Sequence, residues 1–231
     1  MYFDMQLTIV VTNACDRRCE LCVAQWLRRD EPRYMMTLDQ IADFVVCTKQ
    51  SDYRFRYVTV TGGEPTLWPY LQDAATMLGL ARIADCLLLY SNGHNPKVFT
   101  PELMKLFSAA KLSGYPDEHY AEILARYPDK VSIYPIPEHV VPPTEPVANS
   151  LPAQCLCFGP AYYDGRVYPC LGGFLDDHRM GRRTPGKPIC RGYMDDFDPG
   201  KVVMQETCRY CVTNLPVWTA SPKKPVTNNR R

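Results

Sequence analysis

The chain has 231 residues, of which 46% are hydrophobic and 22% charged, so its composition is that of a globular protein and excludes wholesale disorder. Its 26 basic and 25 acidic residues leave a net charge of +1, and no overall field attracts nucleic acid or an anionic membrane. The sequence contains neither an apolar run near the roughly 20 residues of a membrane span nor a basic secretory signal. We therefore expect a cytoplasmic protein that binds neither nucleic acid nor membrane.

The first 134 residues alternate between short apolar runs, which predict buried strands, and segments with helical spacing. Strands are predicted at 7–11, 57–61, 86–90, 111–113 and 131–134, and helices after Thr37, over 69–79, after Thr100 and over 119–127. Repeated strand–helix units imply a parallel sheet with right-handed crossovers. Five units are too few to close an eight-stranded barrel, so we predict an α/β fold with an open, partial (β/α) barrel.

The pattern changes after residue 134. Residues 135–153 contain six prolines, which exclude helix interiors and central strands, and we interpret this segment as an extended linker. Residues 154–215 are rich in Gly, Pro and Cys and predict a small annex that needs a cross-link; within it, Asp164-Gly165 predicts the turn of a β-hairpin. Residues 216–231 are basic, and we expect a disordered tail. The predicted core domain is therefore 1–134.

Cysteine is abundant, with 11 residues in a chain that has no predicted export signal, which favours metal binding or catalysis over disulfides. Cys15, Cys19 and Cys22 follow the first predicted strand, at the end where α/β proteins place their sites. Three thiolates so closely spaced can bind one face of an iron–sulfur cube and leave its fourth iron open. The alternatives are a zinc site without a nearby fourth ligand and buried thiols that act as small hydrophobic groups.

A second motif follows the second predicted strand, at the same end of the sheet: Gly62-Gly63-Glu64-Pro65. A Cx3CxxC motif followed by GGEP resembles the radical S-adenosylmethionine (radical SAM) superfamily, over roughly residues 5–135. The resemblance implies that the three cysteines bind a [4Fe-4S] cluster whose open iron is chelated by S-adenosylmethionine (SAM). It also implies that Gly62, Gly63 and Glu64 receive the SAM ammonium and that Pro65 holds the turn.

Further cofactor contacts are implied by the same resemblance. Ser91 and Asn92, at the end of the third predicted strand, match positions that touch the SAM ribose or carboxylate, and Ser113 after the fourth is of the same type. Leu21 departs from the family pattern, because this position is often aromatic, so we expect adenine to rest on an aliphatic surface. One electron from the cluster would cleave SAM to methionine and a 5′-deoxyadenosyl radical, which abstracts a substrate hydrogen.

The predicted annex holds a second group of cysteines: Cys155, Cys157, Cys170, Cys190, Cys208 and Cys211. Their spacing is similar to that of the C-terminal auxiliary cluster of radical SAM enzymes, in the short "twitch" form rather than the longer SPASM form. The resemblance implies a second [4Fe-4S] cluster held by Cys170, Cys208 and Cys211 with either Cys155 or Cys157. A four-cysteine zinc site uses the same residue types and is the alternative.

We therefore predict a radical SAM enzyme that abstracts hydrogen from a small polar metabolite or a peptide side chain. The expected partners are that substrate and a reducing protein such as flavodoxin or ferredoxin. A glycyl-radical-enzyme activase is the first rival prediction. A non-catalytic metal-bound interaction module is the second, and it would leave the predicted SAM-ammonium motif without a purpose.

Overall fold

The computed structural model describes residues 1–17, 33–114, 119–135, 159–168, 170 and 186–195. Its strands are β1 (Tyr2–Val10), β2 (Arg54–Thr61), β3 (Ala84–Ser91), β4 (Ala109–Gly114), β5 (Val131–Pro135), β6 (Ala161–Tyr163), β7 (Arg166–Tyr168) and β8 (Lys187–Pro188). Its helices are α2 (Leu38–Gln50), α3 (Leu71–Ala81), α4 (Pro101–Leu106) and α5 (His119–Arg126), with short 3₁₀ helices η1 (Pro65–Leu67) and η2 (Pro96–Val98).

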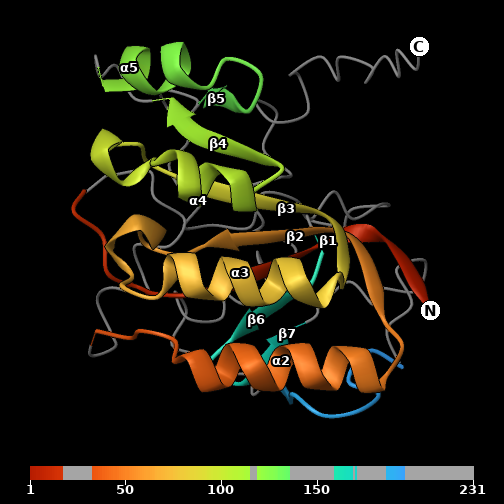
Figure 1. Ribbon diagram of the computed structural model, residues 1–231. Coiled ribbons are helices and arrows are strands. Elements are labelled where there is room, and N and C mark those ends of the chain that lie inside the picture. The colour runs from red at the N-terminus through yellow and green to blue at the C-terminus, as the bar shows by residue number, and fades with distance from the viewer. Residues whose placement is uncertain (18–32, 115–118, 136–158, 169, 171–185, 196–231) are drawn as a thin grey trace, which may run out of the picture.

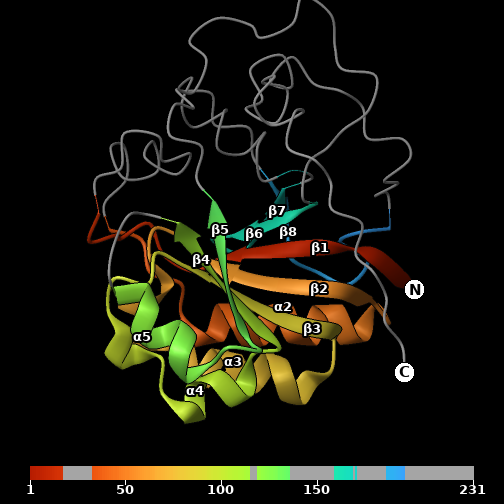
Figure 2. The same cartoon turned by 90° about the horizontal axis from the view of Figure 1, so that it is seen from above.

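The strands form one sheet in the order β5-β4-β3-β2-β1-β6-β7-β8. The five strands from β1 to β5 run parallel, and β6 also pairs parallel with β1. Helices α2 to α5 cover one face of this sheet (Figures 1 and 2). The predicted α/β class and parallel sheet are confirmed, and the arrangement is consistent with a partial barrel.

Local signals set most of the element boundaries. Thr37, after which the sequence predicts a helix, forms a capping box with Gln40, and the Thr100 side chain caps α4. Strand β1 begins five positions earlier than predicted, at Tyr2, because the buried Phe3 pairs with Phe55 of β2.

Helix α3 also differs from its prediction. It begins at Leu71 rather than residue 69, and it continues past Gly79 to Ala81. Arg82 then ends the helix with a left-handed φ of 52°, a conformation that glycine most often supplies at the end of a helix.

The hydrophobic core lies between the sheet and these helices. Leu7 of β1 pairs with Val58 of β2, and Ile9 pairs with Val60, so these four side chains lie side by side in the core. Every second residue of each strand faces the helices, because side chains alternate between the two faces of a sheet. Trp68 closes this layer, and its indole Nε1 donates a 2.8 Å hydrogen bond to the Met36 carbonyl. Burial of this apolar layer is the main stabilising term of the fold.

The opposite face of the sheet is more polar. Thr8 pairs with Thr59 across β1 and β2, and Thr59 pairs with Leu88 of β3; all three are buried but lie outside the core cluster. Among the described residues, the Thr59 hydroxyl is buried without a hydrogen-bond partner. Farther along this face, the Lys111 ammonium lies 5.3 Å from the centre of the Tyr90 ring.

The predicted hairpin is confirmed in form, with its turn at Asp164 (φ 47°) and Gly165 (φ 69°), and it extends the main sheet. Thr8 and Ile9 of β1 pair with β6, and the chain enters this strand at Gly159, whose φ is 100°. The division into a core, linker, annex and tail stays a prediction.

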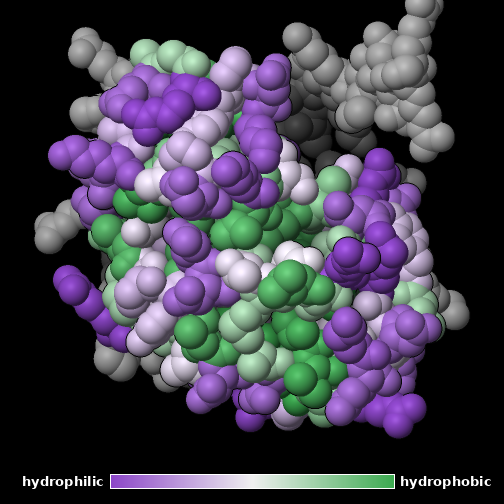
Figure 3. Space-filling view, in the orientation of Figure 1, coloured by the Kyte–Doolittle hydropathy of each residue, from purple (hydrophilic) through white to green (hydrophobic). Residues whose placement is uncertain are grey.

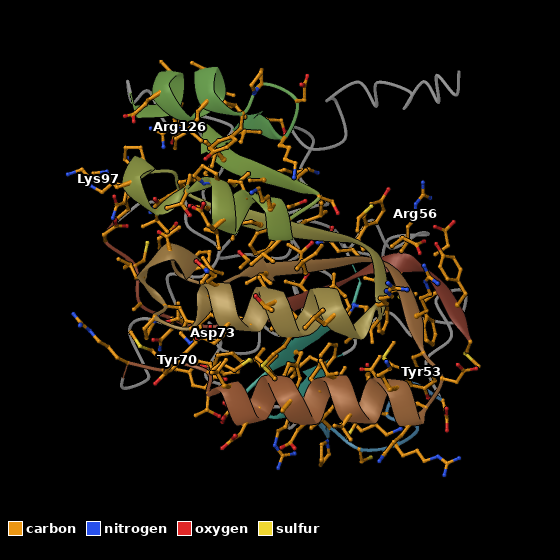
Figure 4. The ribbon with its side chains drawn as sticks, in the orientation of Figure 1. Tyr53, Arg56, Tyr70, Asp73, Lys97 and Arg126 are labelled. Atoms are coloured by element: carbon orange, nitrogen blue, oxygen red, sulfur yellow. The ribbon has the colours of Figure 1, made fainter. Side chains whose placement is uncertain are left out.

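The segment that follows the hairpin packs against α2. The Tyr193 hydroxyl lies 2.9 Å from that of Thr48, and the Gly192 amide donates a 2.7 Å hydrogen bond to Ser51. Tyr53, at the end of α2 (Figure 4), donates a hydrogen bond to Asp195. These contacts anchor residues 192–195 to the helix.

The helix-covered face also exposes apolar side chains (Figure 3), among them Leu80 of α3 and Val46 of α2. Within the part of the chain that the structure describes, no helix is long and apolar enough to span a membrane.

Candidate functional site

The candidate site lies where β1, β2 and β3 end, because parallel strands bring their carboxyl ends to one edge of the sheet. Figure 4 marks the two edges: Arg56 lies toward the amino ends, and Lys97 lies just beyond the carboxyl end of β3. Cys15, the glycine pair and Asn92 all follow strands at the second edge.

The two glycines pack directly on the loop that leads to Cys15. The Gly63 amide donates a 2.7 Å hydrogen bond to the Thr12 carbonyl, and the Glu64 amide donates one of 2.7 Å to the Ala14 carbonyl. A Cβ atom at Gly63 would lie 2.2 Å from the Ala14 oxygen, and one at Gly62 would lie 2.4 Å from the Thr12 oxygen. Only glycine permits this approach, which holds the start of the cysteine loop against the GGEP segment.

Glu64 has no exposed surface, and its carboxylate accepts four hydrogen bonds from protein donors. Its Oε1 accepts from the Thr66 amide (3.0 Å), the Thr66 hydroxyl (2.6 Å) and the Ser91 hydroxyl (2.7 Å), and its Oε2 accepts from the Asn92 amide (2.6 Å). Burial raises the pKa of Glu64, and the donors oppose that rise. The carboxylate therefore joins the end of β2 to the end of β3.

Asn92 extends this network toward the cysteine loop. Its Oδ1 accepts a 2.8 Å hydrogen bond from the His94 amide, and its Nδ2 donates one of 2.7 Å to the Asp16 carboxylate. Asn92 is 7% exposed and Ser91 4% exposed, so both side chains are enclosed by the protein.

The Cys15 sulfur lies near two N–H donors. The Arg17 amide is 3.4 Å from Sγ, and the Asn92 Nδ2 is 3.9 Å from it. The Asp16 Oδ1 also lies 3.9 Å from Sγ and accepts from the thiol. The two N–H groups favour the thiolate, which is the form that binds a metal, and the carboxylate opposes it. The sequence predicts an iron ligand at this position. Cys19 and Cys22 lie outside the described residues.

Tyr120 is a residue of this region that the sequence analysis missed. Its hydroxyl lies 3.0 Å from the Asn92 carbonyl and also hydrogen-bonds the Ser113 carbonyl. Its ring also packs against Gly93, where a Cβ atom would lie 2.7 Å from Tyr120 Cε1. A tyrosine in a short amphipathic helix carries no signal of this contact. Ser113 itself is half-buried and joins the site through its main chain.

The annex cysteines are placed only in part. Cys170 is half-buried and lies two residues after the end of β7. The last residue of β7, Tyr168, pairs with Ala161, which in turn pairs with Thr8 of β1. Four other predicted ligands, Cys155, Cys157, Cys208 and Cys211, lie outside the described residues. The second cluster and its ligand set stay predictions.

Comparison with known proteins identifies the family. The model of the radical SAM superfamily matches residues 9–134, more than half of the chain. The chain belongs to the radical SAM superfamily. No curated protein matches it.

Two solved structures of BtrN share the radical SAM fold of this chain. The structure of BtrN in complex with AdoMet and 2-DOIA has a TM-score of 0.61 and 15% sequence identity, over 89% of this chain and 84% of that one. BtrN in an open conformation has a TM-score of 0.55 and 14% identity, over 90% and 92%.

Proposed function

We propose that this protein cleaves SAM reductively and uses the resulting radical to abstract hydrogen from a substrate. The observation that carries the proposal is the seating of the GGEP segment on the cysteine loop, through the amide hydrogen bonds of Gly63 and Glu64. These contacts bring the predicted cluster-binding motif and the predicted SAM-binding motif to one place.

In this proposal, Cys15, Cys19 and Cys22 hold a [4Fe-4S] cluster that leaves one iron open for SAM. When bound, the cluster supplies the electron that cleaves SAM to methionine and the 5′-deoxyadenosyl radical. Main-chain carbonyls near Gly62 and Gly63 accept the SAM ammonium, and Pro65 fixes the turn that follows. Glu64, Ser91 and Ser113 complete the proposed SAM-binding set.

We propose that the substrate is a small polar metabolite bound on the sheet face opposite the helices. This face carries the Thr59 hydroxyl, which has no hydrogen-bond partner among the described residues, and Lys111 and Tyr90 lie on it near the site. The similarity in fold to BtrN, whose structure contains 2-DOIA, supports a small molecule over a peptide side chain. A flavodoxin or ferredoxin is the proposed electron donor, and the cytoplasm, where thiols stay reduced, is the proposed location.

The test is SAM cleavage in the absence of substrate. Anaerobically reconstituted protein reduced with dithionite should form 5′-deoxyadenosine and methionine slowly, as measured by HPLC. The control carries Cys15→Ala, Cys19→Ala and Cys22→Ala together. If the wild type forms no more 5′-deoxyadenosine than this control, the proposed function is wrong.

We also propose a second, auxiliary [4Fe-4S] cluster, held by Cys170, Cys208, Cys211 and either Cys155 or Cys157. The family resemblance of the cysteine spacing supports it. Two four-iron clusters predict about eight irons per chain, and the Cys208→Ala, Cys211→Ala variant should retain about four. Elemental analysis that finds one zinc and about four irons in the wild type would instead show a structural zinc site.

A further inference from the structure

Three strand ends are linked through one residue, Asn92. It follows β3, its main-chain amide is bound by Glu64 after β2, and its side chain reaches Asp16 and Cys15 after β1. The family resemblance implies only a contact with SAM for this residue, so these bonds point to a different role.

The orientation of Asn92 is fixed by the groups around it. The Glu64 carboxylate holds its amide, the Tyr120 hydroxyl hydrogen-bonds its carbonyl, and the His94 amide donates to its Oδ1. Because Oδ1 is the acceptor for an amide, the other side-chain atom must be the NH2 group, which faces Asp16 and the Cys15 sulfur.

We propose that Asn92 is a positioning residue for Cys15, the first cysteine of the cluster-binding motif. Its amide tethers the beginning of the cysteine loop through Asp16 and directs an N–H group toward the sulfur. A hydrogen-bond donor near a ligating sulfur stabilises the extra negative charge of a reduced cluster and makes it easier to reduce. The inference rests on the proposed function, because it assumes that Cys15 binds the cluster.

The test uses Asn92→Ala and Asn92→Asp in the full chain. The Asp variant keeps an acceptor for the His94 amide, and both variants remove the donor that faces Cys15. Asn95→Ala and Asn95→Asp are matched controls, since Asn95 is exposed in the same loop and its Oδ1 accepts from the Lys97 amide. Three quantities are measured without substrate: the midpoint potential of the SAM-responsive cluster by EPR, the rate of iron loss to a chelator, and the Kd of SAM.

Both Asn92 variants should shift the SAM-free midpoint potential to more negative values and lose iron on the order of 10-fold faster than the wild type. The Asn95 variants should match the wild type in both quantities. If either Asn92 variant does not fold, as judged by circular dichroism, the other gives the result.

Two results would overturn the inference while leaving the proposed function intact. One is an unchanged potential and iron-loss rate with a weaker Kd for SAM, which would show that Asn92 contacts SAM instead. The other is a lower melting temperature with an unchanged potential, which would show a role in folding alone. A wild type that binds no iron after reconstitution would overturn the proposed function and this inference together.

Discussion

The two halves of the sheet are built on different principles. On one side of β1, strands β2 to β5 are added one after another through helices, so each strand pairs with its neighbour in the sequence. On the other side, β6 comes from residues 161–163, more than 150 positions after the residues of β1 with which it pairs. The first half depends on local repeats, whereas the second depends on a few specific long-range contacts.

The contacts that join the halves are correspondingly specific. At the entry to β6, a Cβ atom at Gly159 would lie 2.0 Å from the Gln6 carbonyl oxygen. On the helix side, the Tyr162 ring stacks on Phe44 with centroids 5.0 Å apart, and its hydroxyl donates to the Gln40 carbonyl. We call these contacts of Gly159 and Tyr162 with the first half of the sheet the joint. Small changes at the joint should lower the free energy of unfolding more than similar changes within the half that is built from strand–helix repeats, which we call the repeated half.

Gly159→Ala should have the largest effect. The substitution places a side chain at φ 100° and against the Gln6 carbonyl, which together cost at least about 3 kcal/mol of unfolding free energy. The control is Gly79→Ala in α3, where a Cβ atom meets nothing within 4 Å; it should stabilise the protein by about 0.5–1 kcal/mol. Urea unfolding of both variants measures the difference, and equal midpoints would contradict the proposed importance of the joint.

Glu64→Gln tests the network at the strand ends of the repeated half. A neutral amide cannot accept from both the Thr66 and the Asn92 amides, so the ligand-free protein should lose about 2 kcal/mol of unfolding free energy. SAM should also bind more weakly, because the GGEP segment is no longer fixed. Thermal melts without SAM and SAM titration give the two values. A weaker Kd with unchanged ligand-free stability would show that the carboxylate acts on SAM rather than on the protein.

Tyr162→Phe is the milder probe of the joint. It keeps the stacking on Phe44 and removes only the 2.8 Å hydrogen bond to the Gln40 carbonyl. The expected loss is about 1 kcal/mol, which lowers Tm by about 2–4 °C in a chain of this size. Tyr70→Phe is the matched control at an exposed position (Figure 4) and should leave Tm unchanged. Equal Tm values for the two variants would show that the hydroxyl of Tyr162 adds nothing to the joint.

The smallest effect is expected at the amino ends of the parallel strands. The hydrogen bond from Tyr2 and the Arg54 guanidinium hold the pKa of Asp85 below its usual value. Its stabilising contribution is present above the usual Asp pKa of about 3.9 and is lost as the pH falls through the lowered pKa. Because the group is exposed, the effect should be small and weaken with salt. Melting Asp85→Asn and the wild type at pH 7 and pH 2 should show a small difference that disappears at the lower pH.

Much of the repeated half was predictable from the sequence because its signals are local. Short apolar runs that alternate with helical segments predicted the five parallel strands, and the Thr37-Leu38-Asp39-Gln40 pattern predicted the beginning of α2. The Asp164-Gly165 turn was predictable for the same reason. The turn places both residues at positive φ, and Asp followed by Gly is a pair that adopts this conformation readily. The placement of the hairpin beside β1 was not, because a three-residue strand carries no information about which edge it will join.

The candidate site divides in the same way. The sequence alone predicted which residues form the candidate site, since Cys15, the glycine pair, Glu64 and Asn92 all lie in motifs that follow strands. Only the tertiary structure decided how they are connected. Hydrogen bonds between Glu64, Ser91 and Asn92 form between loops 27 and 28 positions apart, and they exist because parallel pairing of β2 and β3 brings both loops to one edge. Side-chain partners across strands depend on register and burial, which no local pattern of residues specifies.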